Sequence, residues 1–89
     1  MLVKLIEVYR PQGQRLHLDE IYVSPSAVVS IRSDNNETII EEARTFGIAP
    51  EVKFSKVTIV EGGLSRVATI VGSPEELKEK LNIRQLLRD

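Results

Sequence analysis

The chain has 89 residues, no cysteine and one histidine, and its 12 basic and 13 acidic residues leave a formal net charge of −1 at pH 7. The lack of cysteine excludes disulfides and thiolate metal sites, and a polyanion-binding protein usually carries a basic excess that is missing here. Hydrophobic residues at 42% and charged residues at 28% are typical of a globular protein. We therefore expect a single cytoplasmic domain over residues 1–89, without a secretory signal or a membrane span.

The size of the chain limits its hydrophobic core. A chain this short buries only about 60–65% of the surface that it exposes when unfolded, and small domains often need a further source of stability. Disulfides and thiolate metal sites are excluded, so self-association is the remaining reinforcement. The composition therefore predicts a homo-oligomer.

Short strands are predicted along the first 32 residues. Residues 2–10 carry apolar side chains on both faces, which indicates a strand that is covered on both sides or strongly bent. Leu16 and Leu18 share a face of the next strand, but the following apolar pair begins at Ile21, an odd number of residues later. This phase slip predicts a bulge or bend at Asp19-Glu20. Residues 27–32 read as a third strand.

Residues 37–46 fit two structures. Helical spacing is seen for Ile39, Ile40, Ala43 and Phe46. Asn36 and Gly47 are suitable residues to cap the two ends of such a helix. Alternatively, residues 38–40 pair as a hairpin with the strand before them. We favour the short helix.

The clearest strand signal is a hairpin. Residues 52–61 alternate between apolar and polar side chains, and residues 65–71 form the return strand. Gly62-Gly63 between them supplies the turn.

A helix is predicted over residues 73–89. Ser73 followed by Pro74 and Glu76 forms a capping box with proline at the first helical position. Leu77 and Leu81 lie one turn apart and give this helix a buried stripe.

No arrangement of residues indicates catalysis, a metal or a cofactor. Gly62-Gly63 lies between two strands, whereas a phosphate loop leads into a helix. His17 has Asp19 and Glu20 nearby but no second histidine, so we expect it to face solvent. Residues 34–37 are rich in oxygen ligands but lack the spacing of a calcium loop, and no serine lies in a nucleophile elbow. The sequence therefore predicts a protein that is not an enzyme, with no cofactor and no metal site.

Two sets of residues are candidates for binding. The two-sided apolar strands and the apolar tail suggest a subunit contact, for which the candidates are Leu2, Val3, Leu5, Val60, Ile70, Leu86 and Leu87. Basic side chains near strand ends, together with the aromatic rings of Tyr9, Tyr22 and Phe54, suggest contact with single-stranded nucleic acid. The basic candidates are Arg10, Arg15, Arg32, Lys53, Lys56 and Arg66.

The order of a strand, a turn, a bent strand, a further strand and a strong hairpin over residues 2–71 resembles a small Sm-like β-barrel. The resemblance implies five bent antiparallel strands, ring assembly through edge strands and, in many members, RNA binding. Sm-like RNA chaperones place their helix before the first strand, whereas the capped helix here follows the last one. Their RNA-contact motifs match no residue of this chain.

A second resemblance is to small uncharacterised bacterial and phage proteins, including the flagellar FlbD-like group. It is carried by Tyr22-Val23-Ser24-Pro25, Val57–Val60, Gly62-Gly63 and Ser73-Pro74-Glu75-Glu76-Leu77, and it implies no activity.

The predicted fold is mainly β (α+β): a small, strongly bent antiparallel sheet or an Sm-like barrel of about five strands, followed by a C-terminal helix. The expected function is that of a non-enzymatic interaction or assembly domain that self-associates. The alternative is an Sm-like module that binds nucleic acid, in particular RNA. A specific biochemical role does not follow from the sequence.

Overall fold

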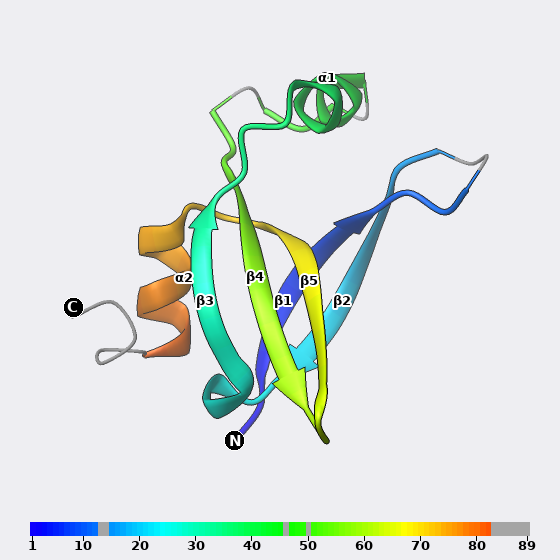
Figure 1. The fold of residues 1–89 in the computed structure, drawn as a ribbon. Helices are drawn as coiled ribbons and strands as arrows, with labels where there is room; N and C mark the ends of the chain where they lie inside the picture. The colour runs from blue at the N-terminus through cyan, green and yellow to red at the C-terminus, as the bar shows by residue number, and fades with distance from the viewer. Residues whose placement is uncertain (13–14, 46, 50, 83–89) are drawn as a thin grey trace.

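The computed structural model describes residues 1–12, 15–45, 47–49 and 51–82. Its elements, in chain order, are β1 (Val3–Tyr9), β2 (His17–Val23), the short 3-10 helix η1 (Pro25–Ala27), β3 (Val28–Ser33), α1 (Glu37–Thr45), β4 (Phe54–Glu61), β5 (Leu64–Val71) and α2 (Pro74–Leu81). All strand pairs are antiparallel and form one sheet in the order β2-β1-β5-β4-β3 (Figure 1). The coarse class predicted from the sequence, a small mainly β fold of the α+β class, is confirmed.

The sheet is open, so of the two predicted forms the Sm-like barrel is wrong and the antiparallel sheet is the form found. Closure would require β2 to pair with β3, but these two strands are the edges of the sheet in the described part of the chain. Only two residue pairs, Glu7↔Ile70 and Val8↔Thr69, join β1 to β5. Because this junction is short, the β1–β2 ribbon crosses the β3–β4–β5 meander at a wide angle, as Figure 1 shows.

The main core lies between the crossed ribbons and under α2. Its buried members are Leu5, Val23, Ala27, Val28, Ile31, Val57, Ile59, Ala68, Ile70, Leu77 and Leu81. Both strands of the β1–β2 ribbon contribute to it, as does every strand of the meander, and α2 adds its two leucines. The buried stripe predicted for Leu77 and Leu81 is therefore confirmed.

A second, smaller cluster lies on the opposite side of the sheet, under α1. It contains Val8, Leu16, Ala43 and Phe54 as buried residues, with half-buried apolar side chains around them. Leu5 belongs to the main core and Val8 to this cluster, so β1 is covered on both faces, as its two-sided apolar pattern predicts.

The predicted bulge at Asp19-Glu20 is wrong. β1 and β2 pair without interruption from Val3↔Val23 to Tyr9↔His17. The apolar phase slips because Leu16 precedes the strand and is buried under α1, whereas Leu18 points outward and is 48% exposed. The register shift that the structure does contain lies in β3, between Val28 and Ser30.

Residues 37–45 form a helix, which confirms the interpretation favoured for residues 37–46, and Phe46 lies outside the described residues. Asn36 Oδ1 accepts hydrogen bonds from the backbone amides of Thr38 and Ile39, at 3.0 and 3.4 Å. Gly47 has a φ of +84° just beyond the helix, and its N–H donates to the carbonyl of Arg44. Both predicted caps therefore act as expected.

α2 begins with the predicted capping box. The Glu76 amide donates to Ser73 Oγ and the Ser73 amide donates to Glu76 Oε1, both at 3.1 Å. The helix ends at Leu81, where Asn82 adopts the left-handed conformation with φ +55°. It is thus shorter than the predicted span of 73–89, of which residues 83–89 lie outside the described part.

The predicted hairpin is formed by β4 and β5. Their register runs without a shift from Phe54↔Val71 to Glu61↔Leu64. Gly62 and Gly63 make the turn with φ values of +57° and +80°, which is the positive-φ pair that a type I′ turn requires.

Candidate interaction surface

The β2 strand is an uncovered edge of the sheet. Its inner side pairs with β1 over seven residues, and no described element pairs with its outer side. The other edge strand, β3, is interrupted by the register shift and lies beside α2 (Figure 1). Natural proteins protect edge strands with bulges, prolines, charged side chains or a covering element. Within His17–Val23, β2 carries the charged side chains of Asp19 and Glu20 but no bulge, lysine or proline. Its free backbone donors and acceptors can therefore take a further strand.

Two large apolar side chains stand on the outer face of β2. Leu18 is 48% exposed and Tyr22 is 60% exposed. Glu20 lies between them on the same face, because alternate residues of a strand point the same way. Lys4 on β1 reaches Glu20, with Nζ 3.5 Å from Oε2. The face is therefore amphipathic, with a charge-paired centre and an apolar side chain on either side.

The predicted subunit contacts fall into three groups. Leu2 and Val60 are exposed and Val3 is half-buried, so their side chains retain free surface. Leu5 and Ile70 are at most 1% exposed in the chain's own core, so assigning them to a subunit contact was wrong. Both faces of their strands are rich in apolar residues, and the face that carries Leu5 and Ile70 packs in the main core. Leu86 and Leu87 lie outside the described residues.

The sequence reading missed Leu18 and Tyr22 as contact residues. The spacing of Leu16 and Leu18 puts both on one strand face, but only Leu16 is buried. Tyr22 is predicted as a stacking ring for nucleic acid, and it also belongs to the stretch Tyr22-Val23-Ser24-Pro25 that carries the second resemblance. The available signal was the alternation of Leu18, Glu20 and Tyr22 against Ile21 and Val23, which marks two opposite faces.

The structure disperses the six basic candidates. Arg32 on β3 and Lys56 on β4 are cross-strand neighbours, and both are exposed. Arg10 forms an ion pair with Glu42, and Arg66 forms one with Glu7 at 3.0 Å. The remaining two candidates are apart from these: Lys53 lines a hollow with the start of α2, and Arg15 is exposed before β2. Only one adjacent pair of cations therefore remains from the predicted set.

The aromatic candidates are also separated. Phe54 is 4% exposed in the second cluster, so it is a core residue and offers no stacking platform. Tyr9 stacks on His17, with ring centroids 5.6 Å apart and an angle of 25° between the rings. His17 is exposed, as predicted. Asp19 raises the pKa of Tyr9 above its ordinary value, first as a hydrogen-bond acceptor and then as a negative charge.

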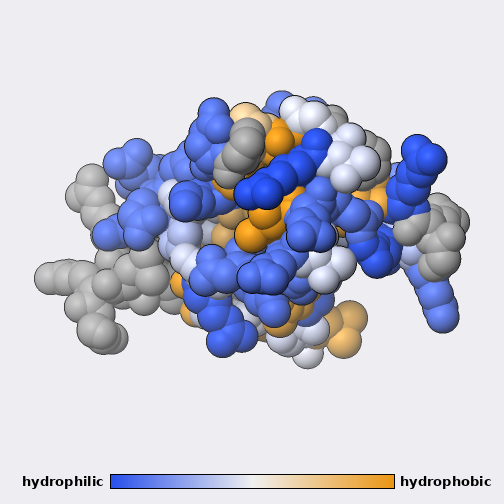
Figure 2. All heavy atoms as spheres, turned by 90° about the horizontal axis from the view of Figure 1, so that it is seen from above, coloured by the Kyte–Doolittle hydropathy of each residue, from blue (hydrophilic) through white to orange (hydrophobic). Residues whose placement is uncertain are grey.

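Two hollows flank α1. One, of about 300 Å³, lies between the β3–α1 connection, the start of β4 and the first turn of α2. The other, of about 370 Å³, lies between β1, β5 and the start of α1, with Val8, Leu16 and Ile39 in its wall. Seen from the α1 end, apolar atoms show in the middle of a mainly hydrophilic face (Figure 2). Both hollows are open to solvent. The titratable groups in the wall of the first are Asp34, Arg44, Lys53 and Glu75, and those of the second are Glu7, Tyr9 and Arg10.

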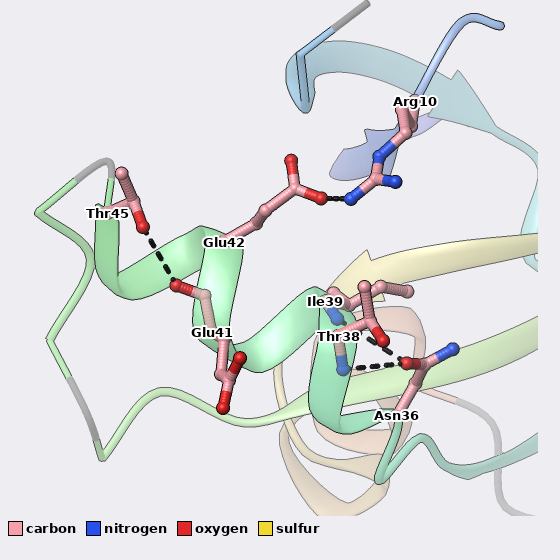
Figure 3. A network of polar contacts seen from close by, with 7 residues as sticks. All are labelled: Arg10, Asn36, Thr38, Ile39, Glu41, Glu42 and Thr45. Carbon is pink, nitrogen blue, oxygen red and sulfur yellow. Dashed lines mark hydrogen bonds and ion pairs between the residues drawn. The ribbon is translucent and has the colours of Figure 1, made fainter. Parts of the chain in front are cut away.

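An ion pair ties α1 to the β1–β2 ribbon. Arg10, just after β1, points toward Glu42 on α1, as Figure 3 shows. In the same region Thr45 Oγ1 donates to the Glu41 carbonyl at 3.1 Å, and Asn36 caps the start of the helix. The Arg10–Glu42 pair links α1 to the β1–β2 ribbon, whereas the other two contacts lie within the helix and its cap.

Over the described ranges of the chain, no three histidine or acidic side chains are placed so that they could hold a metal ion. Among the same residues, no helix is long and apolar enough to span a membrane. The open β2 edge combines an unpaired outer side with exposed Leu18 and Tyr22, whereas Leu64 and Val67, which are exposed as well, belong to β5 between β1 and β4.

Comparison with known proteins adds no relative: no protein-family model, no curated protein and no solved structure matches this chain.

Proposed function

We propose that this chain is a non-enzymatic interaction domain that self-associates through the β2 edge and its outer face. The observation that carries this proposal is a regular seven-residue edge strand with no described cover and with Leu18 and Tyr22 exposed on it. Adding a strand to an open edge satisfies its backbone groups, and side chains on alternate positions supply specificity. A second copy of the chain brings a matching edge, which a symmetric dimer requires.

Self-association would also add buried apolar surface to a domain with a small core. The main core is built on a bent sheet with one helix over it, and a second copy would bury Leu18 and Tyr22 without any new element. Burial of apolar surface contributes roughly 25 cal/mol per Å². A shared ten-stranded sheet would thus reinforce a domain that has no disulfide.

The test is the mass of the full-length chain in solution. Sedimentation velocity from about 1 to 200 µM, a range that brackets micromolar affinities, should show a dimer that grows with concentration. A Leu18→Ser/Tyr22→Ser variant should shift the same series toward the monomer. A Lys78→Ser/Lys80→Ser variant on α2 serves as the matched control and should leave the series unchanged. A wild-type chain that remains monomeric over the whole range would overturn the proposal.

Binding of nucleic acid is the competing proposal, and the adjacent cations Arg32 and Lys56 are the observation in its favour. Two of the other basic candidates are already in ion pairs, so self-association is better supported. Binding to a single-stranded oligonucleotide that weakens steeply with salt and with Arg32→Ser/Lys56→Ser would favour nucleic acid. No binding at low salt would exclude it.

A further inference from the structure

We infer that two copies of the chain pair antiparallel through β2, with the two-fold axis at Glu20. This inference rests on the proposed self-association and specifies its geometry. The two-fold axis stands perpendicular to the joined sheet, so each residue on the axis faces its own copy. The occupant of the β2 edge is therefore a second β2 strand in one defined register.

Symmetry limits the registers that are available. In an antiparallel pair, directly opposite side chains lie on the same face of the sheet. A two-fold axis perpendicular to the sheet must therefore lie midway between the two copies of one residue, so that this residue faces itself across the axis. A centre at Glu20 pairs all seven residues, from His17 facing Val23 to Val23 facing His17. A centre at Asp19 or at Ile21 shortens the ladder to five residues. The Glu20 register therefore satisfies the most backbone groups on the open edge.

The side chains of the outer face suit the same register. With the axis at Glu20, Leu18 of each copy faces Tyr22 of the other, so the two exposed apolar side chains cover each other twice. Cross-strand pairs of an aromatic ring with an aliphatic side chain are among those that stabilise a sheet. The same two residues are the large apolar side chains left exposed on β2.

The charge at the centre is already compensated within each copy. Two glutamates facing each other would repel, but Lys4 lies 3.5 Å from Glu20 in the single chain. The pairing would bring together two lysines and two glutamates, a quartet with no net charge. By contrast, a centre at Asp19 would place two aspartates opposite each other, and neither has a lysine partner among the described contacts.

The first experiment tests the centre by cross-linking, for which a chain without cysteine is well suited. In Glu20→Cys, the two thiols face each other across about 4.5–5.5 Å between Cα atoms, within the range that a disulfide bridges. In the control Asp19→Cys, the two cysteines are offset along the strands by two residues and lie about 8 Å apart, which is too far. Mild oxidation should cross-link most of Glu20→Cys and little of Asp19→Cys. The reverse pattern would overturn the inference.

The second experiment tests the register by exchanging an apolar pair for a charged one. Leu18→Lys and Tyr22→Glu should each weaken the dimer about tenfold, because each substitution removes two cross-strand pairs. The double variant should recover most of that loss, since the introduced lysine of each copy would face the introduced glutamate of the other. In the register centred on Ile21, position 22 faces Glu20, so the double variant would remain weak and would contradict the inference.

The outcomes separate the inference from the proposed function. A wild-type chain that dimerises while Glu20→Cys fails to cross-link contradicts the register and leaves self-association standing. Loss of dimer in Leu86→Ser/Leu87→Ser but not in the β2 variants would assign the contact to the C-terminal segment and overturn the inference. A chain that never dimerises overturns both proposals. Circular dichroism of every variant, matched to the wild type, confirms that the fold is retained.

Discussion

The two helices of this domain differ in how they are attached to the sheet. α2 is closed at its start by a reciprocal capping box and places Leu77 and Leu81 in the main core, where both are at most 2% exposed. α1 is capped by Asn36 alone at its start and buries Ala43, with Ile39 and Ile40 only half-covered. The Arg10–Glu42 ion pair and the cluster that Ala43 shares with Val8 and Leu16 link it to the β1–β2 ribbon.

This difference indicates that α2 is part of the structural unit whereas α1 is an addition to it. The main core draws side chains from all five strands, so removing α2 exposes the centre of the domain. The smaller cluster joins α1 to β1 and β4, and its loss leaves the main core closed. Regions with few buried apolar contacts open at lower free energy than the whole protein. We therefore expect α1 to open locally and α2 to unfold together with the sheet.

The largest expected effect is from Leu81→Ala. The side chain is 1% exposed, so its truncation should cost about 3 kcal/mol of the free energy of unfolding. The control is Leu18→Ala, where the same truncation at an exposed site should change stability by less than about 1 kcal/mol. Urea denaturation at a low protein concentration measures both. A cost below about 1 kcal/mol for Leu81→Ala would contradict the assignment of α2 to the core.

A glycine at one end of each helix provides the next comparison. Gly72 precedes α2 with φ +131°, and a Cβ there would lie 3.2 Å from Leu77 Cδ2. Gly47 follows α1 with φ +84°, and a Cβ there would meet nothing within 4 Å. Gly72→Ala should cost about 2 kcal/mol from strain and crowding, whereas Gly47→Ala should cost about 1 kcal/mol from strain alone. Equal thermal melting of the two variants would show that the crowding at Leu77 is relieved.

Removing either helix cap should lower the free energy of unfolding by a similar amount, but the loss should affect different amides in the two variants. Ser73→Ala and Asn36→Ala should each cost about 1 kcal/mol. The loss in Ser73→Ala should appear as faster hydrogen exchange throughout the core, because α2 unfolds with the sheet. The loss in Asn36→Ala should be confined to the amides of α1. Core-wide acceleration in Asn36→Ala would show that α1 is not separable from the main unit.

The smallest expected effect is a change in the pKa of Tyr9, which lies on the β1–β2 ribbon and outside both helices. Asp19 raises the pKa of Tyr9, so any stability that this shift supplies is present below the ordinary pKa of tyrosine and is lost as the pH rises through the raised value. Asp19→Asn should lower the pKa of Tyr9 toward its ordinary value. A phenolate absorbance titration in a Tyr22→Phe background isolates the signal. An unchanged titration would remove Asp19 as the cause.

Local signals in the sequence predicted the elements well. The capping box at Ser73, the Gly62-Gly63 turn and the caps at Asn36 and Gly47 each act through neighbours close in the chain, so the residues alone specify them. The alternation in residues 52–61 likewise set the faces of β4. These features need no knowledge of how the elements come together.

The predictions that the structure contradicts all depend on contacts between segments that are distant in the sequence. Leu16 and Leu18 have the spacing of one strand face. However, α1 packs over Leu16 and not over Leu18, so Leu16 is buried and Leu18 is exposed. Leu5 and Ile70 resemble contact residues until the curl of the sheet encloses them. Whether the curl closes into a barrel depends on the short β1–β5 junction, which no local pattern encodes.

Hydrogen exchange of the β2 amides, measured at low and high protein concentration, tests the central claim most directly. Every second residue of β2 points its N–H away from β1 and should exchange rapidly in the dilute chain. We expect these outward amides to become protected as the concentration rises, while those of α1 do not change. If the β2 amides exchange at the same rate throughout while the chain dimerises, the contact lies elsewhere and the claim fails.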